Sequence, residues 1–266
     1  MNKWKVALAS VIGTSHTERG VECQDYCDHK FLQIGDDEIV VAVVDDGEGS
    51  DSNSLEGAEL ACSYFINEVE IFLSQGKSIT DLDREFGEHW LAYIQQRIGD
   101  LAATNDRNLR DFACTFLAAL VDDESAVFYQ IGDGGMVFSP IEREGEFFWA
   151  LVPEESVYAN TTNFITDKSA TEKLQYEILS QPVKSLVMFT DGVQGLAVDY
   201  RDASPGKPHQ PFLRPMLSPL ATDTEITVIN EKLHLFLNSK EINERTDDDK
   251  TIVLISRNET ANIKLE

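Results

Sequence analysis

The most informative segment of the chain is Glu38-Ile39-Val40-Val41-Ala42-Val43-Val44-Asp45, and Asp46-Gly47-Glu48-Gly49-Ser50 follows it directly. A continuous run of β-branched residues predicts a strand over residues 38–45 that is buried on both faces. Aspartate is uncommon inside strands, and glycine allows the backbone to turn sharply or to approach a ligand closely. The stretch therefore predicts a buried strand that ends in a tight acidic turn.

Two amphipathic helices are predicted after this strand. Residues 54–75 carry apolar side chains at helical spacing, namely Leu55, Ala58, Cys62, Phe65, Val69 and Phe72. We expect Ser54 to cap the N-terminus of this helix and Gly76 to end it. A second helix over 80–103 has an apolar stripe that consists of Leu82, Phe86, Trp90, Ile94, Ile98 and Leu101. Two long antiparallel helices joined by a short loop would cover one face of a sheet.

The rest of the chain shows a strand pattern with polar turns. We predict further strands over residues 4–12, 112–121, 126–131, 136–138, 146–152, 184–190 and 251–256. A last helix is marked by Ile226, Ile229, Leu233 and Phe236. Residues 153–175 are polar and are predicted to be irregular. Five of the eight prolines lie in 199–219, which predicts a loop with at most short helices.

No internal repeat or low-complexity linker interrupts the sequence. Residues 1–266 are therefore predicted to form a single α+β domain in which helices cover the sheets. Apolar residues make up 42% of the chain, which is enough to build a large core and excludes wholesale disorder.

The net charge of the chain limits the classes of partner that it can bind. The chain has 22 basic and 47 acidic residues, so its formal net charge is −25. Phosphates repel such a chain, and we expect neither nucleic acid nor an anionic membrane as its partner. No apolar stretch is long enough to cross a membrane, and residues 4–12 are interpreted as a first strand rather than a signal peptide. The charge is compatible with binding cations.

Four cysteines are too few for a disulfide framework in a chain of 266 residues. Cys62 and Cys114 lie among apolar residues and are expected in the core, which suggests a reducing, cytoplasmic compartment. Cys23 and Cys27, with His29, are the one candidate for a zinc site, and this pattern is weak.

Aspartates recur at the predicted strand ends. They are Asp25, Asp45, Asp46, Asp133, Asp191, Asp247, Asp248 and Asp249. Each Asp-Gly pair taken singly is also a common turn sequence. If the strand ends converge, however, several carboxylates share one small volume and need a compensating positive charge. A hard divalent cation such as Mg²⁺ or Mn²⁺ supplies it, because it prefers oxygen ligands.

Taken in order, these blocks resemble the protein phosphatase 2C family of metal-dependent Ser/Thr phosphatases, in particular its short bacterial members. The similar blocks are Trp4 with Ser10-Val11-Ile12-Gly13, Cys23-Gln24-Asp25, Val44 to Ser50, Gly57-Ala58, Cys114 to Leu117, Ile131 to Gly134, Thr190-Asp191-Gly192, and Asp248 to Thr251. The resemblance covers nearly the whole chain. It implies a four-layer β-sandwich of two mainly antiparallel sheets flanked by helix pairs, with a metal site at one end.

The resemblance also implies the ligands of two Mg²⁺ or Mn²⁺ ions. It matches Asp46 to the bridging aspartate, Gly47 to a backbone carbonyl ligand, and Asp191 and Asp248 to the other ligands of the first ion. Asp25 matches a ligand that acts through water, and Asp133 the aspartate of members that hold a third ion. A water held as hydroxide between the ions then attacks phosphorus, with Asp46, Asp191 and Asp248 as the catalytic set.

The implied activity is hydrolysis of phosphoserine and phosphothreonine on proteins, in signalling that opposes a kinase. Three departures from the family pattern concern the acid and the phosphate contact. Glu48 stands where many members have a histidine, Gln24 replaces a glutamate, and the phosphate-binding arginine has no counterpart, although Arg19 is near. His16 is a further candidate for either role, or a turn residue.

Two other functions stay open at this level. The chain could be a catalytically weak or inactive phosphatase-like module that binds a partner, which the departures would permit. It could also be an acidic, cation-binding protein unrelated to phosphatases, in which case the aspartates would lie scattered. The resemblance further implies a mobile flap before the strand that leads to Thr190-Asp191-Gly192, which places it at 153–180, and residues 199–219 form a second irregular loop.

Overall fold

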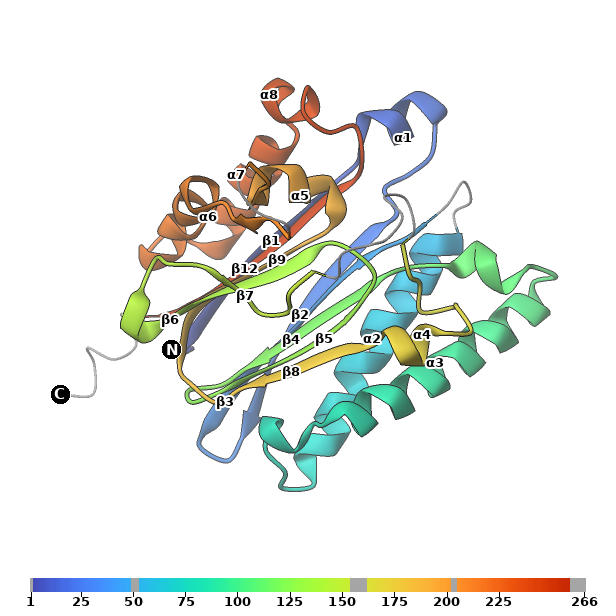
Figure 1. The fold of residues 1–266 in the computed structure, drawn as a ribbon, viewed down its shortest axis with the longest axis horizontal. Helices are drawn as coiled ribbons and strands as arrows, with labels where there is room; N and C mark the ends of the chain where they lie inside the picture. The colour runs from blue at the N-terminus through green and yellow to red at the C-terminus, as the bar shows by residue number, and fades with distance from the viewer. Residues whose placement is uncertain (1, 49–52, 154–161, 202–204, 259–266) are drawn as a thin grey trace.

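Two five-stranded sheets lie face to face in the computed structural model, which describes residues 2–48, 53–153, 162–201 and 205–258 (Figure 1). The first sheet contains, in spatial order, β1 (Trp4–Val11), β12 (Lys250–Arg257), β9 (Val183–Phe189), β6 (Gly135–Pro140) and β7 (Phe148–Trp149). The second contains β2 (Asp25–Ile34), β3 (Asp37–Asp46), β4 (Phe116–Val121), β5 (Ala126–Ile131) and β8 (Gln175–Leu179). The neighbouring strands in both sheets pair antiparallel, which confirms the predicted α+β sandwich.

Strand β3 is buried on both faces, as its β-branched run predicts. Val40, Ala42 and Val44 belong to the core between the two sheets. Val41 and Val43 belong to the core beneath the helices on the other side. Successive side chains of a strand point to opposite faces, so a strand between two apolar layers must be apolar at nearly every position.

A pair of long helices, α2 (Asn53–Ser74) and α3 (Arg84–Thr104), covers the outer face of the second sheet (Figure 1). Phe65 of α2 lies at the centre of this layer. Its ring centroid is 5.3 Å from that of Trp90 on α3 and 5.0 Å from that of Phe116 on β4. These aromatic contacts join both helices to the sheet and fix the end of β4 beside the acidic turn.

The outer face of the first sheet carries shorter helices. They are α5 (Asp191–Ala197), α6 (Gln210–Leu217) and α7 (Ile226–Leu237), with α8 (Lys240–Asn243) following. Leu213, Leu217 and Leu233 pack from these helices onto Ile252 and Leu254 of β12. This layer completes the four-layer arrangement. The proline-rich segment 199–219 contains short elements in this layer. The two-residue strands β10 (Val198–Asp199) and β11 (Lys207–Pro208) pair with each other, and α6 follows with a proline in its first turn, where proline is tolerated.

Two helix starts differ from the sequence prediction. Ser54 lies inside α2 and is fully buried, so it is not the N-cap of that helix. Helix α3 begins at Arg84 rather than at residue 80, because the carboxylate of Asp83 accepts a hydrogen bond of 3.0 Å from the backbone N–H of Phe86. Residues Ile79–Asp81 form a separate 3₁₀ turn.

Two strand predictions were too long. Strand β4 begins at Phe116 instead of residue 112, because Leu109–Phe112 form a 3₁₀ turn that Asp111 closes through a 2.9 Å bond to the N–H of Asn108. The strand expected over 146–152 is reduced to Phe148–Trp149.

Some elements were missed from the sequence. Strands β2 and β8 occupy the two edges of the second sheet, where mixed polar and apolar side chains give a weak pattern. Helix α5 contains two glycines, which are poor helix formers. The prediction of an irregular segment over 153–175 was wrong where it includes α4 (Ala170–Lys173). In the predicted flap over 153–180, residues 154–161 lie outside the described part, and 175–179 are a sheet strand.

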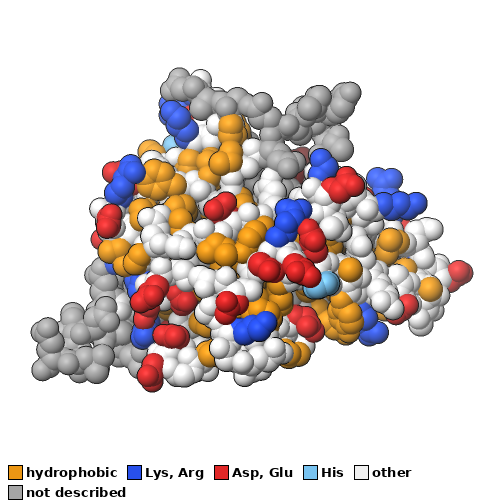
Figure 2. Space-filling model, turned by 60° about the horizontal axis from the view of Figure 1, so that its bottom comes forward, with side chains coloured by type: hydrophobic (Ala, Val, Ile, Leu, Met, Phe, Trp, Pro, Cys, Tyr) orange, Lys and Arg blue, Asp and Glu red, His pale blue; other side chains and the backbone are white. Residues whose placement is uncertain are grey.

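Acidic side chains are spread over the face drawn in Figure 2, among apolar patches and isolated basic groups. This distribution agrees with the net charge of −25. Among the described residues, none of the helices is long and apolar enough to span a bilayer.

Candidate metal centre and active site

The acidic strand ends meet at one end of the sandwich. Asp46 ends β3, and its partner in the register with β2 is Asp25. Asp191 begins α5 directly after β9, and Asp133 lies in the turn between β5 and β6. One carboxylate oxygen from each of Asp46, Asp133 and Asp191 lies within 4.8 Å of the other two. The aspartates therefore converge, and an acidic protein with scattered aspartates is excluded.

A cavity of about 320 Å³ lies against this cluster. Its lining consists of Ser15, His16, Arg19, Gln24, Asp46, Gly47, Glu48, Thr162, Phe164, Asp191 and Asp248. It thus brings together residues that the resemblance matches to metal ligands and the three whose role it left open, His16, Arg19 and Glu48. The volume suits a phosphoryl group and part of the side chain that carries it.

Asp248 reaches the cavity because the segment before β12 is held between two close backbone contacts. A Cβ atom at Gly13 would lie 2.4 Å from the carbonyl oxygen of Asp247, and a Cβ atom at Gly192 would lie 1.8 Å from that of Asp249. Any side chain at either position would push the segment away. The two glycines therefore set the distance between Asp248 and the ends of β3 and β9.

The electrostatics of the cluster show that its charges are crowded. Burial raises the pKa of Asp46 well above its usual value, and the charges of Asp25 and Asp191 raise it further. Burial also raises the pKa of Asp191, with the charge of Asp133 as the next cause. Carboxylates this close cannot all ionise without a compensating cation.

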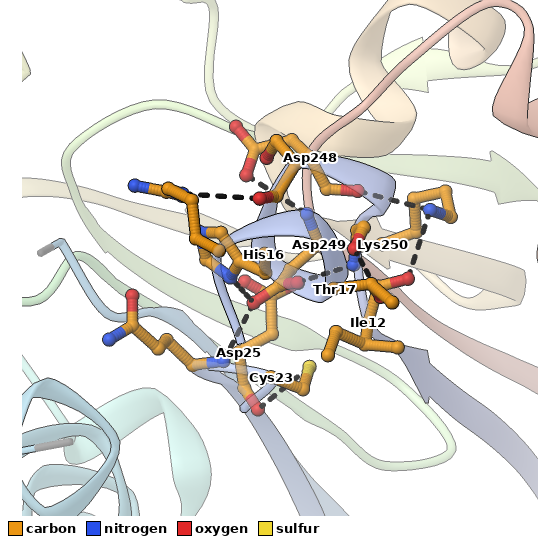
Figure 3. Close-up of polar contacts among 12 residues, drawn as sticks. Ile12, His16, Thr17, Cys23, Asp25, Asp248, Asp249 and Lys250 are labelled. Carbon is orange, nitrogen blue, oxygen red and sulfur yellow. Dashed lines mark hydrogen bonds and ion pairs between the residues drawn. The ribbon is translucent and has the colours of Figure 1, made fainter. Parts of the chain in front are cut away.

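One buried cation lies near the cluster but does not pair with these carboxylates. The ammonium of Lys250 is fully buried and donates to the backbone carbonyl oxygens of Asp248, at 3.0 Å, and Ile12, at 3.4 Å (Figure 3). Its hydrogen bonds hold the turn before β12 rather than neutralise the cluster.

Asp25 is more buried than Asp46, Asp133 and Asp191. Its Oδ2 accepts a hydrogen bond of 2.8 Å from the hydroxyl of Thr190, and the same hydroxyl accepts one of 3.1 Å from the N–H of Thr251. Its Oδ1 is buried and has no hydrogen-bond partner among the described residues. Burial raises the pKa of Asp25, and the charge of Asp249 adds to the effect. An unpartnered buried carboxylate oxygen is the kind of atom that a cation or its water would satisfy.

The donor set fits a hard divalent cation. Within the described ranges, the group of metal-ligating side chains that come together is Asp46, Asp133 and Asp191, which offer oxygen atoms only. Cys23 and Cys27 do not form such a group with His29, so the zinc alternative has no support. The thiol of Cys23 contacts the hydroxyl of Ser10 at 3.3 Å instead.

Asp249, which was not among the predicted site residues, makes close polar contacts beside the cavity. Its Oδ1 accepts from the N–H of Gly13 at 2.6 Å, and its Oδ2 accepts from the N–H of Gln24 at 2.7 Å. Oδ2 also lies 2.8 Å from Nδ1 of His16, one of the cavity residues (Figure 3). The only sequence signal was its place in the run Asp247-Asp248-Asp249, where spacing alone does not separate a ligand from a supporting residue.

Two threonines were also missed as supporting residues. Thr190 lies in the Thr190-Asp191-Gly192 block, so the motif points to this region but indicates a role only for its aspartate. Thr162 donates a hydrogen bond of 2.7 Å to Oδ2 of Asp133 from a segment predicted to be irregular, and nothing in the local sequence indicates this contact.

Arg19 and Glu48 line the cavity without strong contacts to the carboxylates. The Nε of Arg19 donates to the carbonyl of Ser15 within the same short helix, at 3.2 Å. Glu48 is held through its backbone, whose N–H donates to the carbonyl of Ala113 at 2.9 Å. Both residues therefore line the cavity, and neither side chain takes part in the hydrogen bonds described above for the carboxylates.

Comparison with known proteins gives one consistent result. The sequence profile of the family described as "Protein phosphatase 2C" matches residues 12–238. "Serine/threonine-protein phosphatase 3" from Escherichia coli (strain K12) is 36% identical over 256 residues, which cover 94% of this chain and 97% of that protein.

Solved structures show the same fold at low sequence identity. The serine/threonine phosphatase of S. agalactiae has a TM-score of 0.64 and 12% identity, and the match covers 96% of this chain and 99% of that one. The catalytic domain of the serine threonine protein phosphatase PstP, solved in complex with 2 manganese ions, has a TM-score of 0.62 and 13% identity, with coverages of 96% and 99%.

Proposed function

Because the chain belongs to the protein phosphatase 2C family, we propose that it is a metal-dependent serine/threonine phosphatase that hydrolyses phosphomonoesters on proteins. The observation that carries the proposal is the convergence of Asp46, Asp133 and Asp191 beside a cavity of about 320 Å³. Relatives with this fold have been solved with manganese or magnesium. Their likeness supports Mg²⁺ or Mn²⁺ as the cofactor here.

The residues that would hold the cations are Asp46, Asp133, Asp191, Asp248, the backbone carbonyl of Gly47 and, through water, Asp25. When bound, the cations would supply positive charge for the phosphoryl oxygens. They would also lower the pKa of a water molecule, which makes it a better nucleophile toward phosphorus. The chain's own part is to place the carboxylates at the strand ends and to close the cavity on one side with α1 (Thr14–Arg19). Thr190 and Thr162 orient two of these carboxylates through hydrogen bonds.

A covalent cysteine mechanism receives no support from the thiol nearest the cluster. Burial raises the pKa of the Cys23 thiol to about 12, with the charge of Asp25 as a further cause. The thiol is therefore protonated at neutral pH and is a poor nucleophile. Direct attack by water is the simpler reaction for this site.

We further propose that the substrate is a protein phosphorylated by a Ser/Thr kinase, so that the enzyme opposes that kinase in cytoplasmic signalling. The four cysteines are all unpaired, which suits a reducing compartment. The acidic surface suits a protein substrate better than a nucleic acid.

The test is hydrolysis of p-nitrophenyl phosphate and of a phosphothreonine peptide, with Mn²⁺ or Mg²⁺ and with excess EDTA. We expect turnover of both substrates that requires the cation and is insensitive to okadaic acid. Full activity in EDTA would contradict the metal mechanism. Cation binding without turnover would favour an inactive partner-binding module, which Glu48 and Gln24 would explain as departures from the family pattern.

A further inference from the structure

His16 and Asp249 form a buried pair at the wall of the proposed active site. Nδ1 of His16 lies 2.8 Å from Oδ2 of Asp249, and the two residues are 7% and 2% exposed (Figure 3). They come from opposite ends of the chain, His16 from α1 and Asp249 from the turn before β12. Only the tertiary fold brings them together, beside Asp46 and Asp191 in the same cavity.

The carboxylate of Asp249 is held rigidly. The N–H of Gly13 and the N–H of Gln24 each donate to it, at 2.6 and 2.7 Å. Two backbone donors leave the carboxylate little freedom to rotate. These donors hold both of its oxygens, and Asp249 is not among the residues that line the cavity, so it acts as a support for the imidazole and not as a ligand in the cavity.

This support decides which nitrogen of His16 serves the cavity. Nδ1 is the ring nitrogen that lies against Asp249, 2.8 Å from Oδ2, although the two groups are not aligned as a hydrogen bond. Nε2 lies on the opposite side of the ring, and the residue lines the cavity that Asp46 and Asp191 also line. The ring proton that can be offered to the cavity is therefore the one on Nε2.

We propose that His16 is a catalytic residue that donates the Nε2 proton to the leaving oxygen, and that Asp249 is its positioning residue; this rests on the proposed function. In the step, a water oxygen forms a bond to phosphorus and the phosphorus–oxygen ester bond breaks. The Nε2 proton passes to the serine or threonine oxygen, which leaves as a neutral alcohol. A proton released by the attacking water restores the imidazolium, and the other water hydrogen stays on the phosphate.

The other cavity residues are weaker candidates for this proton. Arg19 donates from Nε to the carbonyl of Ser15, and a guanidinium is too weak an acid to give up a proton to the leaving oxygen. Glu48 lines the cavity but has no partner that fixes its carboxyl group toward a substrate among the hydrogen bonds described for it. The test therefore compares the effects of substituting Glu48 and His16.

The test compares two leaving groups. Nitrophenolate leaves without being protonated, whereas the alkoxide of threonine needs a proton as it departs. His16→Asn is the key variant, because the amide nitrogen of asparagine can take the place of Nδ1 beside Asp249 while nothing replaces Nε2. His89→Gln, on the exposed surface of α3, is the matched control.

We expect His16→Asn to lower kcat for a phosphothreonine peptide by about 100-fold and kcat for p-nitrophenyl phosphate by no more than about threefold. Asp249→Asn should lower the peptide rate preferentially as well, whereas a purely structural defect would slow both substrates alike. His89→Gln should match the wild type. Mn²⁺ affinity, measured by calorimetry, should be unchanged in His16→Asn.

Equal losses on both substrates, or no loss on the peptide, would overturn the assignment. A leaving-group-dependent loss in Glu48→Gln but not in His16→Asn would overturn it too and would make Glu48 the acid. Failure of the proposed function gives a different result, because the wild type would then hydrolyse neither substrate in Mn²⁺ and both proposals would fall.

Discussion

Asp45 and Asp46 are neighbours in sequence and carry the same functional group, yet they belong to two different regions of the molecule. Asp46 faces the cavity between the sheets, where Asp133 and Asp191 approach it. Asp45 is fully buried on the other side of β3, and both of its carboxylate oxygens lack hydrogen-bond partners among the described groups. Burial raises the pKa of Asp45 well above its usual value, and the thiol of Cys114 is its nearest stabilising contact.

A carboxylate in this protein therefore becomes functional through its surroundings and not through its motif. Around Asp46, other carboxylates and an open cavity create a demand for a cation. Around Asp45, the buried side chains of Cys62 and Cys114 offer neither a cation nor space for one. We expect removal of the Asp46 carboxylate to change catalysis, and removal of the Asp45 charge to change the stability of the fold.

The largest expected effect is on activity. Asp46→Ala and Asp191→Ala should each lower Mn²⁺-dependent turnover by at least about 100-fold, the scale of losing one group that stabilises the transition state. The fold should persist, because each change relieves crowding among like charges. Steady-state kinetics with a phosphothreonine peptide and circular dichroism measure the two properties. Wild-type turnover in either variant would refute its assignment as a ligand.

The next effect is stabilisation by the cation. At 100 times its dissociation constant, Mn²⁺ or Mg²⁺ should stabilise the folded state by about 2.7 kcal/mol, because the unfolded chain lacks the assembled site. Thermal melts at matched ionic strength should show the shift in the wild type and in Asp100→Ala, whose side chain is exposed on α3, but not in Asp46→Ala. Equal shifts with NaCl and MgCl₂ would reduce the effect to screening.

A smaller effect should come from the support of Asp25. Thr190→Val keeps the side-chain shape but removes the hydroxyl that donates to Oδ2 of Asp25. We expect Mn²⁺ affinity to fall about 10- to 100-fold, as is usual when a supporting hydrogen bond to a metal ligand is lost. Calorimetric titration of the purified variant is the measurement. Unchanged affinity would show that Asp25 does not take part in cation binding.

The smallest effect concerns Asp45. Its folded-state pKa is raised, so the folded protein binds a proton more tightly than the unfolded chain, and stability falls as pH rises above the unfolded value of the carboxyl group. Asp45→Asn removes this ionisation and should raise the unfolding free energy by about 1 kcal/mol at neutral pH. Activity should stay near the wild-type level.

Urea denaturation at several values between pH 5 and pH 8 checks this prediction. The stability difference between Asp45→Asn and the wild type should grow with pH. A constant difference, or a less stable variant, would show that Asp45 has favourable partners in the folded state.

Elements with a strong hydrophobic period could be predicted from the residues alone. The β-branched run of β3 and the apolar stripes of α2 and α3 require burial on particular faces, so their types follow from side-chain chemistry alone. The aspartates at strand ends, and their likeness to one family, indicated which residues to look for. Edge strands β2 and β8 were not predicted, because their half-exposed side chains do not follow a clear apolar period.

Which of these carboxylates act together depends on how the two sheets and the helices pack. The period of two along β3 places Asp45 and Asp46 on opposite faces, but the identity of each face depends on the packing of the second sheet and of α2. His16 and Asp249 are separated by almost the whole chain, and Gly13 and Gly192 allow the backbone contacts that bring them to one wall of the cavity. Such contacts depend on distances between distant segments, which no local pattern of residues encodes.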